Sequence, residues 1–539
     1  MSVTAVRSPR TDLSAAALGL LLAAILVVLL DGPIWLVKIV PTQDGPVHLA
    51  QADLIAQSGW GGTLPEPVSA FYQWNPRIEP NSAVYLLLAS LIYATGNALL
   101  ANSIFLTLYG LIWIAAAFFA ARAETSGPLL PALLLLPIAF GVFIHWGFYN
   151  YALGIPLFLL FAAFWRSLAD RRDVFASIGV GSFLLLLCLT HLASVVAACL
   201  LLAADGIARA SKPLKRDGAR AAFQGLVRDG IWAFAVATPA LLLILGFLIA
   251  YQDIPPAGPG IDGGYLQIVR RIAAATYLFT FTWWEVVALS PLLIAVVIAA
   301  ATSLRRMDKG DLLWPVFLVI IVFVSLLNLK TGAAFLSERL APFSGIAVIL
   351  TIASRQPAPA VVRAMSLAAI LGLTGQSFVR VLAYRSWSPL LEQVFAAARS
   401  HPGETFANAD LLPQRASTMF GWRVRPMLHA NQTAAVAAHG AGLSSPLPST
   451  RYFFGYFPLQ YVPAHDFMRA TPDWVDEPDP RSATAFQRAN QGAPQRLIVT
   501  AIDRSGSELA SRLGYNDCRE SLVAERRLLV CGHTVQDAR

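Results

Sequence analysis

LSAAALGLLLAAILVVLL at residues 13–30 is the stretch that decides the fold, because it is a long apolar run without a single charged side chain. A helix needs roughly 20 such residues to cross a hydrocarbon core of about 30 Å. The whole chain of 539 residues has the same character: it is 56% hydrophobic and 13% charged, whereas soluble domains carry about a quarter charged residues. Mean hydropathy is +0.59. We therefore predict an α-helical polytopic membrane protein.

Further apolar blocks follow the first. They lie near residues 82–96, 100–121, 129–145, 148–165, 174–189, 191–207, 231–251, 286–304, 312–328, 342–354 and 361–382. Blocks of this length suit helices rather than barrel strands, which predicts about 10–12 apolar helices. Arg7 and Arg10 precede the first block, but no small-residue cleavage site follows it, so it is interpreted as an uncleaved span.

The basic residues predict which loops face the cytoplasm. They gather at 166–172, 209–220, 305–309 and 355–363, and the N-terminus joins them on that side. Loops 41–81, 252–285 and 329–341, together with everything after 383, are then expected outside. Four blocks connect loop 41–81 to the basic loop at 166–172, and an even number cannot join opposite sides. Block 82–96 is the candidate for a juxtamembrane helix that does not cross.

The tail has the composition of a soluble domain. We place the membrane domain at 1–385 and a small extracytoplasmic α/β domain at 386–539, with β-like runs at 496–500 and 527–530 around a helical stretch at 505–513. Cys518 and Cys531 flank a predicted hairpin at 520–530. A disulfide there would fit an oxidising compartment, and two unpaired thiols are the alternative.

The first outer loop carries the most informative motif, PTQDGPVHLAQAD at residues 41–53. Asp44 is placed to cap the N-terminus of a helix whose first turn contains Pro46, and His48 and Gln51 fall on adjoining turns. The loop is acidic overall. A partly desolvated carboxylate at a membrane surface is suited to act as a general base on an acceptor hydroxyl. The alternative is that Asp44 only caps the helix.

The order of these parts resembles the GT-C membrane glycosyltransferases: one span, a large outer loop that opens with an aspartate, many more spans and a soluble outer domain. QDGPVHL at 43–49 resembles the start of that family's first loop, and AVYLLL at 83–88 with Gly96 resembles its juxtamembrane segment. The resemblance implies transfer of a sugar from a polyprenyl-phosphate carrier to an extracytoplasmic acceptor, an EC 2.4 activity, with Asp44 as the base. It also implies a multi-pass protein of a bacterial-type inner (plasma) membrane.

The leaving lipid phosphate in such a reaction needs cations. Lys330 and Arg339 lie in the outer loop 329–341, against the usual charge bias of that side. Arg270 and Arg271, on an amphipathic stretch, form a second candidate pair, and either pair could hold a phosphate. The alternative for both pairs is interfacial snorkelling or a salt bridge such as one with Glu338.

Polar residues near the outer ends of the apolar blocks are candidates for a sugar pocket. They are His145, Tyr149 and Asn150, with His191 at the outer tip of the hairpin 174–207. Polar groups at such depth face protein or a water-filled cavity. The alternative is an aromatic belt with hydrogen-bonded structural histidines.

No cofactor is required by this chemistry, because Lys and Arg can hold the phosphate. Where the family often has an acidic pair, this chain has Asp44–Gly45, and no Cys/His cluster has zinc-like spacing, so a divalent cation is possible but unsupported. The sequence contains no Walker-type motif, which argues against an ATP-driven pump. The net charge of +8 is attributed to cytoplasmic loops rather than to nucleic-acid binding. A transporter or flippase, and a structural assembly subunit, are the alternative functions; the sugar, the acceptor and the oligomeric state are left open.

Overall fold

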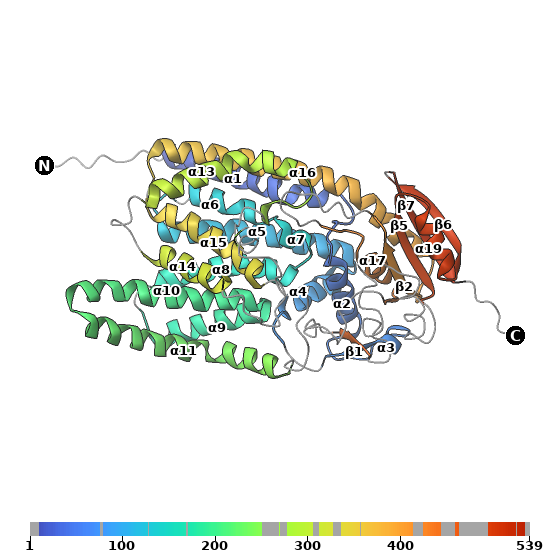
Figure 1. Ribbon diagram of the computed structural model, residues 1–539, viewed down its shortest axis with the longest axis horizontal. Coiled ribbons are helices and arrows are strands. Elements are labelled where there is room, and N and C mark those ends of the chain that lie inside the picture. Colours follow the sequence, from blue (N-terminus) through green and yellow to red (C-terminus); the bar gives the residue numbers. More distant parts are fainter. Residues whose placement is uncertain are drawn as a thin grey trace.

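The computed structural model is a helical bundle with a small sheet domain at one end (Figure 1). It describes residues 10–75, 79–127, 129–168, 171–250, 269, 277–304, 312–326, 336–355, 357–412, 424–443, 459–462, 494–523 and 525–533. The N-terminal end of the chain lies at the end of the bundle away from the sheet domain, and the C-terminal end lies beside the sheet (Figure 1).

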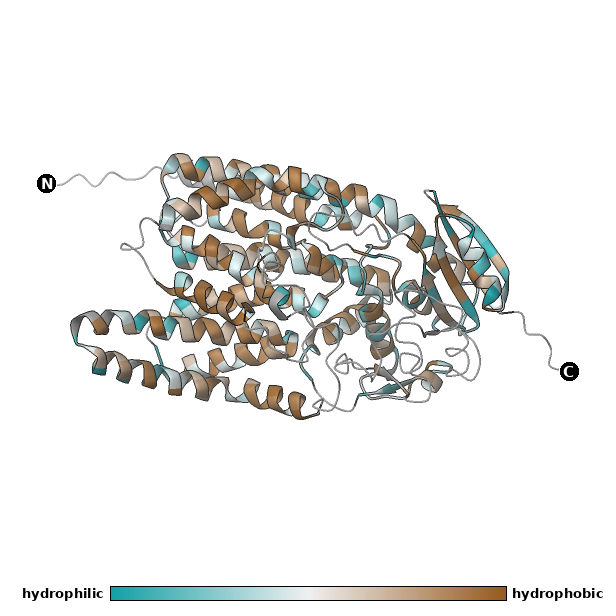
Figure 2. Cartoon of the chain, viewed as in Figure 1, coloured by the Kyte–Doolittle hydropathy of each residue, from teal (hydrophilic) through white to brown (hydrophobic). Residues whose placement is uncertain are grey.

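The helices of the bundle overlap the predicted apolar blocks, although several extend beyond them and block 129–145 is divided among three short elements. They are α1 (Arg10–Trp35), α4 (Ala83–Thr95), α5 (Ala98–Glu124), α6 (Leu129–Leu135), the 3-10 turn η1 (Leu136–Ile138), α7 (Val142–His145), α8 (Tyr149–Leu168), α9 (Val174–Thr190), α10 (Leu192–Arg216), α11 (Ala219–Ala250), α13 (Trp284–Leu304), α14 (Leu313–Leu326), α15 (Leu336–Ser354) and α16 (Pro359–Ala398). Within the described part of the chain, six helices are long and apolar enough to cross a membrane: α5, α8, α10, α11, α13 and α16. Hydrophobic residues cover the bundle, and hydrophilic ones become frequent in the sheet domain (Figure 2).

Helix α4 is too short to span the bilayer in a straight run. Its 13 residues give a length of about 20 Å, against a hydrocarbon core of about 30 Å. It ends at Gly96, whose left-handed φ of 63° closes the helix, and it packs between α5 and α2 (Gly45–Ser58). Its length and position agree with a juxtamembrane helix. That it does not cross the bilayer stays a prediction.

An arginine within the bundle fixes the C-terminal end of α1. Pro33 lies inside α1 and has no N–H, so the carbonyl of Leu29, four residues earlier, lacks its helical donor. Arg380 of α16 donates to that carbonyl at 2.6 Å and to the carbonyl of Leu30 at 2.8 Å. Its guanidinium also lies 4.4 Å above the Phe140 ring. This contact holds α1 against α16 just before the chain enters loop 41–81.

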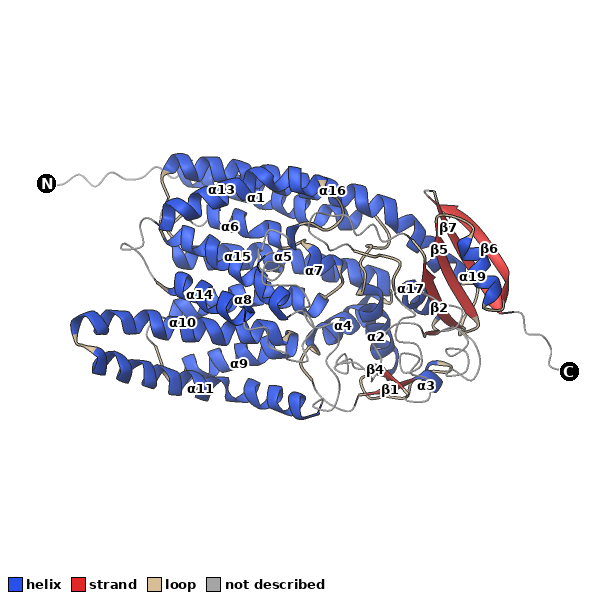
Figure 3. Ribbon diagram, viewed as in Figure 1, coloured by secondary structure: helices blue, strands red, loops and turns tan. Residues whose placement is uncertain are grey.

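The C-terminal domain contains a five-stranded sheet in the order β3-β2-β5-β7-β6 (Figure 3). The strands are β2 (Thr405–Asp410), β3 (Ala441–Gly442), β5 (Arg496–Ala501), β6 (Tyr515–Val523) and β7 (Arg526–His533). β2 is parallel to β3 and β5, whereas β7 is antiparallel to β5 and β6. The predicted α/β class and the runs at 496–500 and 527–530 are confirmed, and the second run is longer than expected.

Alternating side chains of β5 divide the domain into two cores. Leu497 and Val499 pack toward α19 (Ser505–Arg512), which covers one face of the sheet. Ile498 points to the other face, which packs against the last turns of α16 and against α17 (Ala430–Ala438). α16 therefore runs through the expected boundary at 385/386 and carries the sheet on its end. The domain is joined to the bundle by a continuous helix as well as by packing.

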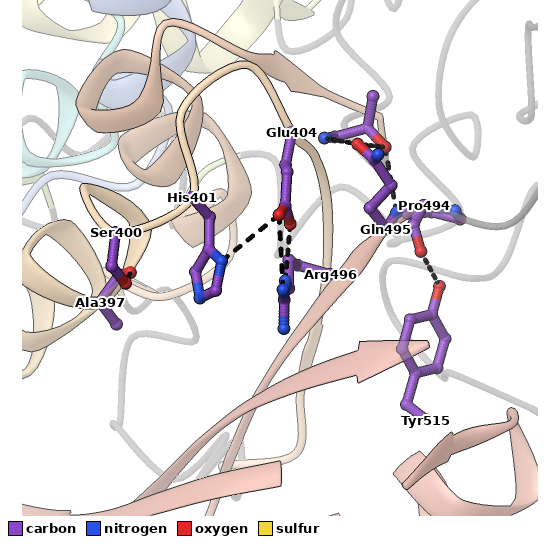
Figure 4. Close-up of polar contacts among 9 residues, drawn as sticks. Ala397, Ser400, His401, Glu404, Pro494, Gln495, Arg496 and Tyr515 are labelled. Carbon is purple, nitrogen blue, oxygen red and sulfur yellow. Dashed lines mark hydrogen bonds and ion pairs between the residues drawn. The ribbon is translucent and has the colours of Figure 1, made fainter. Parts of the chain in front are cut away.

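Polar contacts join the residues just before β2 to those at the start of β5 (Figure 4). Arg496 opens β5 and donates to Glu404 at 2.6 Å, and His401 lies 3.4 Å from the same carboxylate. The side chain of Gln495 accepts from the Thr405 backbone N–H at 2.9 Å. These contacts align β2 with β5.

Two more contacts secure the outer parts of the domain. Cys518 and Cys531 are opposite each other on β6 and β7 and are joined by a disulfide. In loop 41–81, α3 (Val68–Phe71) leads into β1 (Tyr72–Trp74), which pairs antiparallel with β4 (Leu459–Tyr461) from the tail. Loop 41–81 and the C-terminal domain are therefore joined by a shared two-stranded sheet.

Candidate functional site

The backbone of Asp44 is held by the turn between α7 and α8. The N–H of Asp44 donates to the Trp146 carbonyl at 2.8 Å, and the N–H of Gln43 donates to the His145 carbonyl at 2.9 Å. Gly147 has a left-handed φ of 79°, and a Cβ built on it would lie 2.2 Å from the Gly45 nitrogen. A glycine is needed there because the two chain segments approach too closely for a side chain.

The carboxylate of Asp44 does not cap α2. The helix begins at Gly45 with Pro46 in its first turn, as predicted, but the Asp44 side chain makes no hydrogen bond to the helix N-terminus. The predicted cap is therefore wrong. The reason is the backbone of Asp44, which is helical (φ −93°, ψ −8°), whereas a capping residue normally has an extended backbone that aims its oxygen at the free N–H groups.

The partner of Asp44 comes from the C-terminal domain. Its Oδ1 lies 3.3 Å from Nε2 of His429, the residue that precedes α17. Both residues are buried, with exposures of 5% for Asp44 and 1% for His429. A second tie lies beside this pair, because the side-chain oxygen of Gln43 accepts from the Arg425 backbone N–H at 3.2 Å. Sequence reasoning missed His429, since it stands in no motif and lies in the other domain.

His48 lies next to the pair in a neutral form. Its Nδ1 is 2.8 Å from the Tyr85 hydroxyl, and its ring is stacked on Tyr149 at 5.6 Å. Burial lowers the pKa of His48 to about 4, although the charge of Asp44 opposes this and that of His429 adds to it. His48 is therefore uncharged at neutral pH. Tyr149 is fixed in turn by the hydroxyl of Thr42 at 3.2 Å.

Arg339 lies beside the turn that holds Asp44. Its guanidinium is 5.2 Å from the centre of the Phe148 ring, and Phe148 follows Gly147 in the chain. The Arg339 carbonyl accepts from the Tyr151 hydroxyl at 2.6 Å. Its Nε is buried and has no hydrogen-bond partner among the described residues. A cationic donor that lacks a partner among the described residues suits an anionic group such as a phosphate.

Three of the predicted cations cannot be placed, and His145 is bonded within the bundle. Lys330, Arg270 and Arg271 lie outside the described residues. His145 has both ring nitrogens engaged, with the Gly141 carbonyl at 2.9 Å and the Tyr384 hydroxyl at 2.8 Å.

Asn150 and His191 make local structural contacts. The side-chain oxygen of Asn150 accepts from the Val84 N–H at 3.3 Å, and Nδ1 of His191 accepts from the Ala193 N–H at 3.0 Å. His191 also meets the ring of Tyr151 edge to face at 5.1 Å. These bonds favour a structural role for both residues, and His191 reaches the surroundings of Arg339 through Tyr151.

A small pocket lies beside the aspartate, and its empty space of about 370 Å³ includes open solvent. Thr42 and Gly45, on either side of Asp44 in the chain, both line it, and Asn102 presents a buried side-chain oxygen that lacks a hydrogen-bond partner in the described structure. The remaining walls are mostly apolar, with Lys38 as the charged lining residue. The carboxylate itself points at His429 rather than into this space. Among the described residues no group of three His, Cys, Asp or Glu side chains could hold a metal ion.

Comparison with known proteins identifies the fold. No protein-family model matches the chain, and no curated protein matches it in sequence. A crystal structure of ArnT from Cupriavidus metallidurans bound to undecaprenyl phosphate matches it with a TM-score of 0.55, covering 97% of this chain and 99% of that one at 10% identity. The GT-C-like architecture predicted from the sequence is thereby confirmed at the level of the fold.

Proposed function

We propose that this chain is an integral membrane glycosyltransferase that moves a sugar from a polyprenyl-phosphate donor to an extracytoplasmic acceptor. The observation that carries the proposal is the fold, which it shares over nearly its whole length with a protein bound to undecaprenyl phosphate. That likeness favours an enzyme over the transporter alternative. The N-terminus and basic loops are placed in the cytoplasm, and the C-terminal domain outside.

Asp44 is assigned as the general base of this reaction. The acceptor hydroxyl gives its proton to the carboxylate, its oxygen bonds to the anomeric carbon, and the bond from that carbon to the lipid phosphate breaks. The polyprenyl phosphate leaves as an anion. Support comes from the position of Asp44, at the junction of the membrane domain and the C-terminal domain and next to a pocket lined by its chain neighbours Thr42 and Gly45.

Arg339 is assigned to the departing phosphate. Its guanidinium stands beside the same turn that holds Asp44, and its Nε lacks a partner among the described residues. A guanidinium binds a phosphate through charge-assisted hydrogen bonds, so charge that develops on the leaving group is stabilised without a metal. Lys330, Arg270 and Arg271 are proposed to assist from the outer loops. His48 and Tyr149, whose rings stack beside Asp44, are proposed to form part of the wall of the sugar pocket, whereas His145, Asn150 and His191 keep the structural contacts described above.

A transfer assay with two aspartate variants tests the assignment. Membranes are supplied with a panel of radiolabelled polyprenyl-phosphate sugars, and wild type is compared with Asp44→Asn and Asp53→Asn. Asp53 is the matched control, because it is a second buried carboxylate on α2 and is bonded to Gln57 at 2.8 Å. We expect Asp44→Asn to lose roughly 10²–10⁴-fold in rate and Asp53→Asn to keep its activity. Equal transfer by Asp44→Asn and wild type removes Asp44 from the mechanism.

The proposed topology has its own test. A cysteine introduced at the exposed Glu508 of the sheet domain should react with a membrane-impermeant maleimide in intact cells, whereas one at the exposed Arg220, near the start of α11, should react only after lysis. Labelling of the Glu508 position only after lysis would place the C-terminal domain in the cytoplasm.

A further inference from the structure

The C-terminal domain inserts one imidazole into the membrane-side site. His429 precedes α17, a helix that packs on α2, and its Nε2 faces Oδ1 of Asp44 at 3.3 Å. Neither domain contains this pair by itself. The contact therefore depends on how the sheet domain sits on the bundle, which α16 and the strand pairing of β1 with β4 determine.

A buried carboxylate at this place needs a partner of this kind. Taking an isolated ionised carboxylate out of water costs far more than one hydrogen bond returns, so an unpaired one becomes protonated instead. The described groups around Asp44 offer little charge: His48 is neutral, and the amide of Gln43 lies at 3.4 Å. Of these described neighbours, His429 is the one whose ring nitrogen faces an oxygen of the carboxylate.

The second ring nitrogen of His429 makes no hydrogen bond to the described residues, so the contact with Asp44 is the polar contact of this imidazole there. Its Nδ1 is buried without a hydrogen-bond partner in the described part of the chain. His145, by contrast, has both nitrogens occupied by the bundle. Because buried polar atoms are normally paired, an imidazole with one unmet nitrogen is a costly choice for structure alone. The contact with Asp44 is therefore the reason we give for a histidine at this position.

The geometry points to His429 as a positioning residue that pairs with Asp44 and orients its carboxylate, so that docking of the C-terminal domain completes the transferase site. This rests on the proposed function for its catalytic consequence, although the pairing itself does not. Nε2 of His429 faces Oδ1, which leaves Oδ2 to accept the proton of the acceptor hydroxyl. The sheet domain is then part of the catalytic machinery rather than a cover for it.

Two variants of His429 separate orientation from bulk. His429→Phe keeps the ring volume and removes the donor, whereas His429→Gln keeps an amide donor of similar reach. In the transfer assay we expect kcat of His429→Phe to fall roughly 10²-fold with KM for the donor nearly unchanged, because misplacing a reacting group affects the chemical step. His429→Gln should recover most of that loss. His401→Phe, in the same domain but paired with Glu404 (Figure 4), should behave as wild type.

A chemical readout that needs no transfer activity tests the pairing. A hydrophobic carbodiimide reacts with protonated buried carboxyl groups, and modification of the peptide that contains Asp44 can be followed by mass spectrometry. We expect Asp44 of wild type and of His429→Gln to be protected at neutral pH, and that of His429→Phe to react several-fold faster.

The outcomes distinguish the two proposals. Equal carbodiimide reactivity in wild type and His429→Phe overturns the pairing, whatever the protein transfers. Increased reactivity with unchanged kcat overturns the catalytic role of His429. If no donor is used by any variant while the reactivity still differs, the proposed function fails and the interdomain pair stands.

Discussion

Replacing Gly147 with alanine should misplace the proposed base from a position that touches no substrate. Gly147 has a φ of 79°, and a Cβ there would lie 2.2 Å from the Gly45 nitrogen and 2.7 Å from both the nitrogen and the carbonyl carbon of Asp44. All three neighbours are backbone atoms, so no side chain can rotate away. The segment that carries Asp44 has to move instead.

The size of the movement follows from the contact distance. Ordinary contacts of a Cβ begin at 3.4 Å, so the Gly45 nitrogen has to retreat by about 1 Å. That shift also strains the hydrogen bond from Asp44 N–H to Trp146, which measures 2.8 Å. A misplacement of about 1 Å in a reacting group can cost roughly 10²-fold in rate, and the left-handed alanine adds about 1–2 kcal/mol of strain.

Gly96→Ala is the matched control. Gly96 also has a left-handed φ, of 63°, but nothing lies within 4 Å of the Cβ that alanine would add. Both variants therefore carry the same backbone strain, and only Gly147→Ala pushes on Asp44. Transfer from a radiolabelled polyprenyl-phosphate sugar is measured for both, together with thermal unfolding in detergent. We expect a similar small fall in Tm for Gly96→Ala with normal kcat, and a large fall in kcat for Gly147→Ala. A Gly147→Ala protein as active as Gly96→Ala would refute the tight packing of the turn on Asp44.

Three further changes test the framework around the site. Arg380→Gln removes two hydrogen bonds to α1 carbonyls, one of which Pro33 has left without a helical donor. We expect about 1–3 kcal/mol of destabilisation, and thermal unfolding of the variant beside wild type checks this. Burial alone would raise the pKa of Glu404, but the hydrogen bond and charge of Arg496 outweigh burial and hold that pKa below its ordinary value of 4.5. The pair therefore stabilises the domain above about pH 4.5, and this stabilisation is lost as the pH falls through the folded-state pKa. The Tm difference between wild type and Glu404→Gln should shrink in acid, and a constant difference would contradict the assignment. Cys518→Ser opens a disulfide that closes a short loop, which we expect to lower stability by about 2–4 kcal/mol and to make Tm insensitive to reductant.

The proposed acid–base chemistry depends on the state of three neighbouring groups. His48 is neutral because burial lowers its pKa to about 4, so it adds no positive charge near Asp44 at neutral pH. His429 is the imidazole that contacts the carboxylate, and we propose that it orients it. The sequence places His48 on the turn after Asp44, yet gives no indication of its charge, because that charge depends on burial by Tyr85 and Tyr149 from other helices.

Asp44 illustrates how far a local pattern can be trusted. The order Asp44–Gly45–Pro46 predicts a helix that starts at this place, and the helix does start there. The same pattern predicts a capping bond that is absent. Helix initiation depends on neighbours in the chain, whereas the direction of the carboxylate is settled by the Trp146 carbonyl and the His429 imidazole, which come from distant segments.

Arg380 illustrates the converse. Inside an apolar block it gives no sign of its role, and its partner carbonyls are free only because Pro33 removes a donor from another helix. The positions of the apolar blocks, the helical class and the extended runs of the tail followed from the sequence, because preference for lipid or water and backbone propensity are properties of each segment. The sheet order, the course of α16 past residue 386 and the meeting of Asp44 with His429 were decided by the tertiary structure, because they depend on which segments bury one another, and no single segment records its partner.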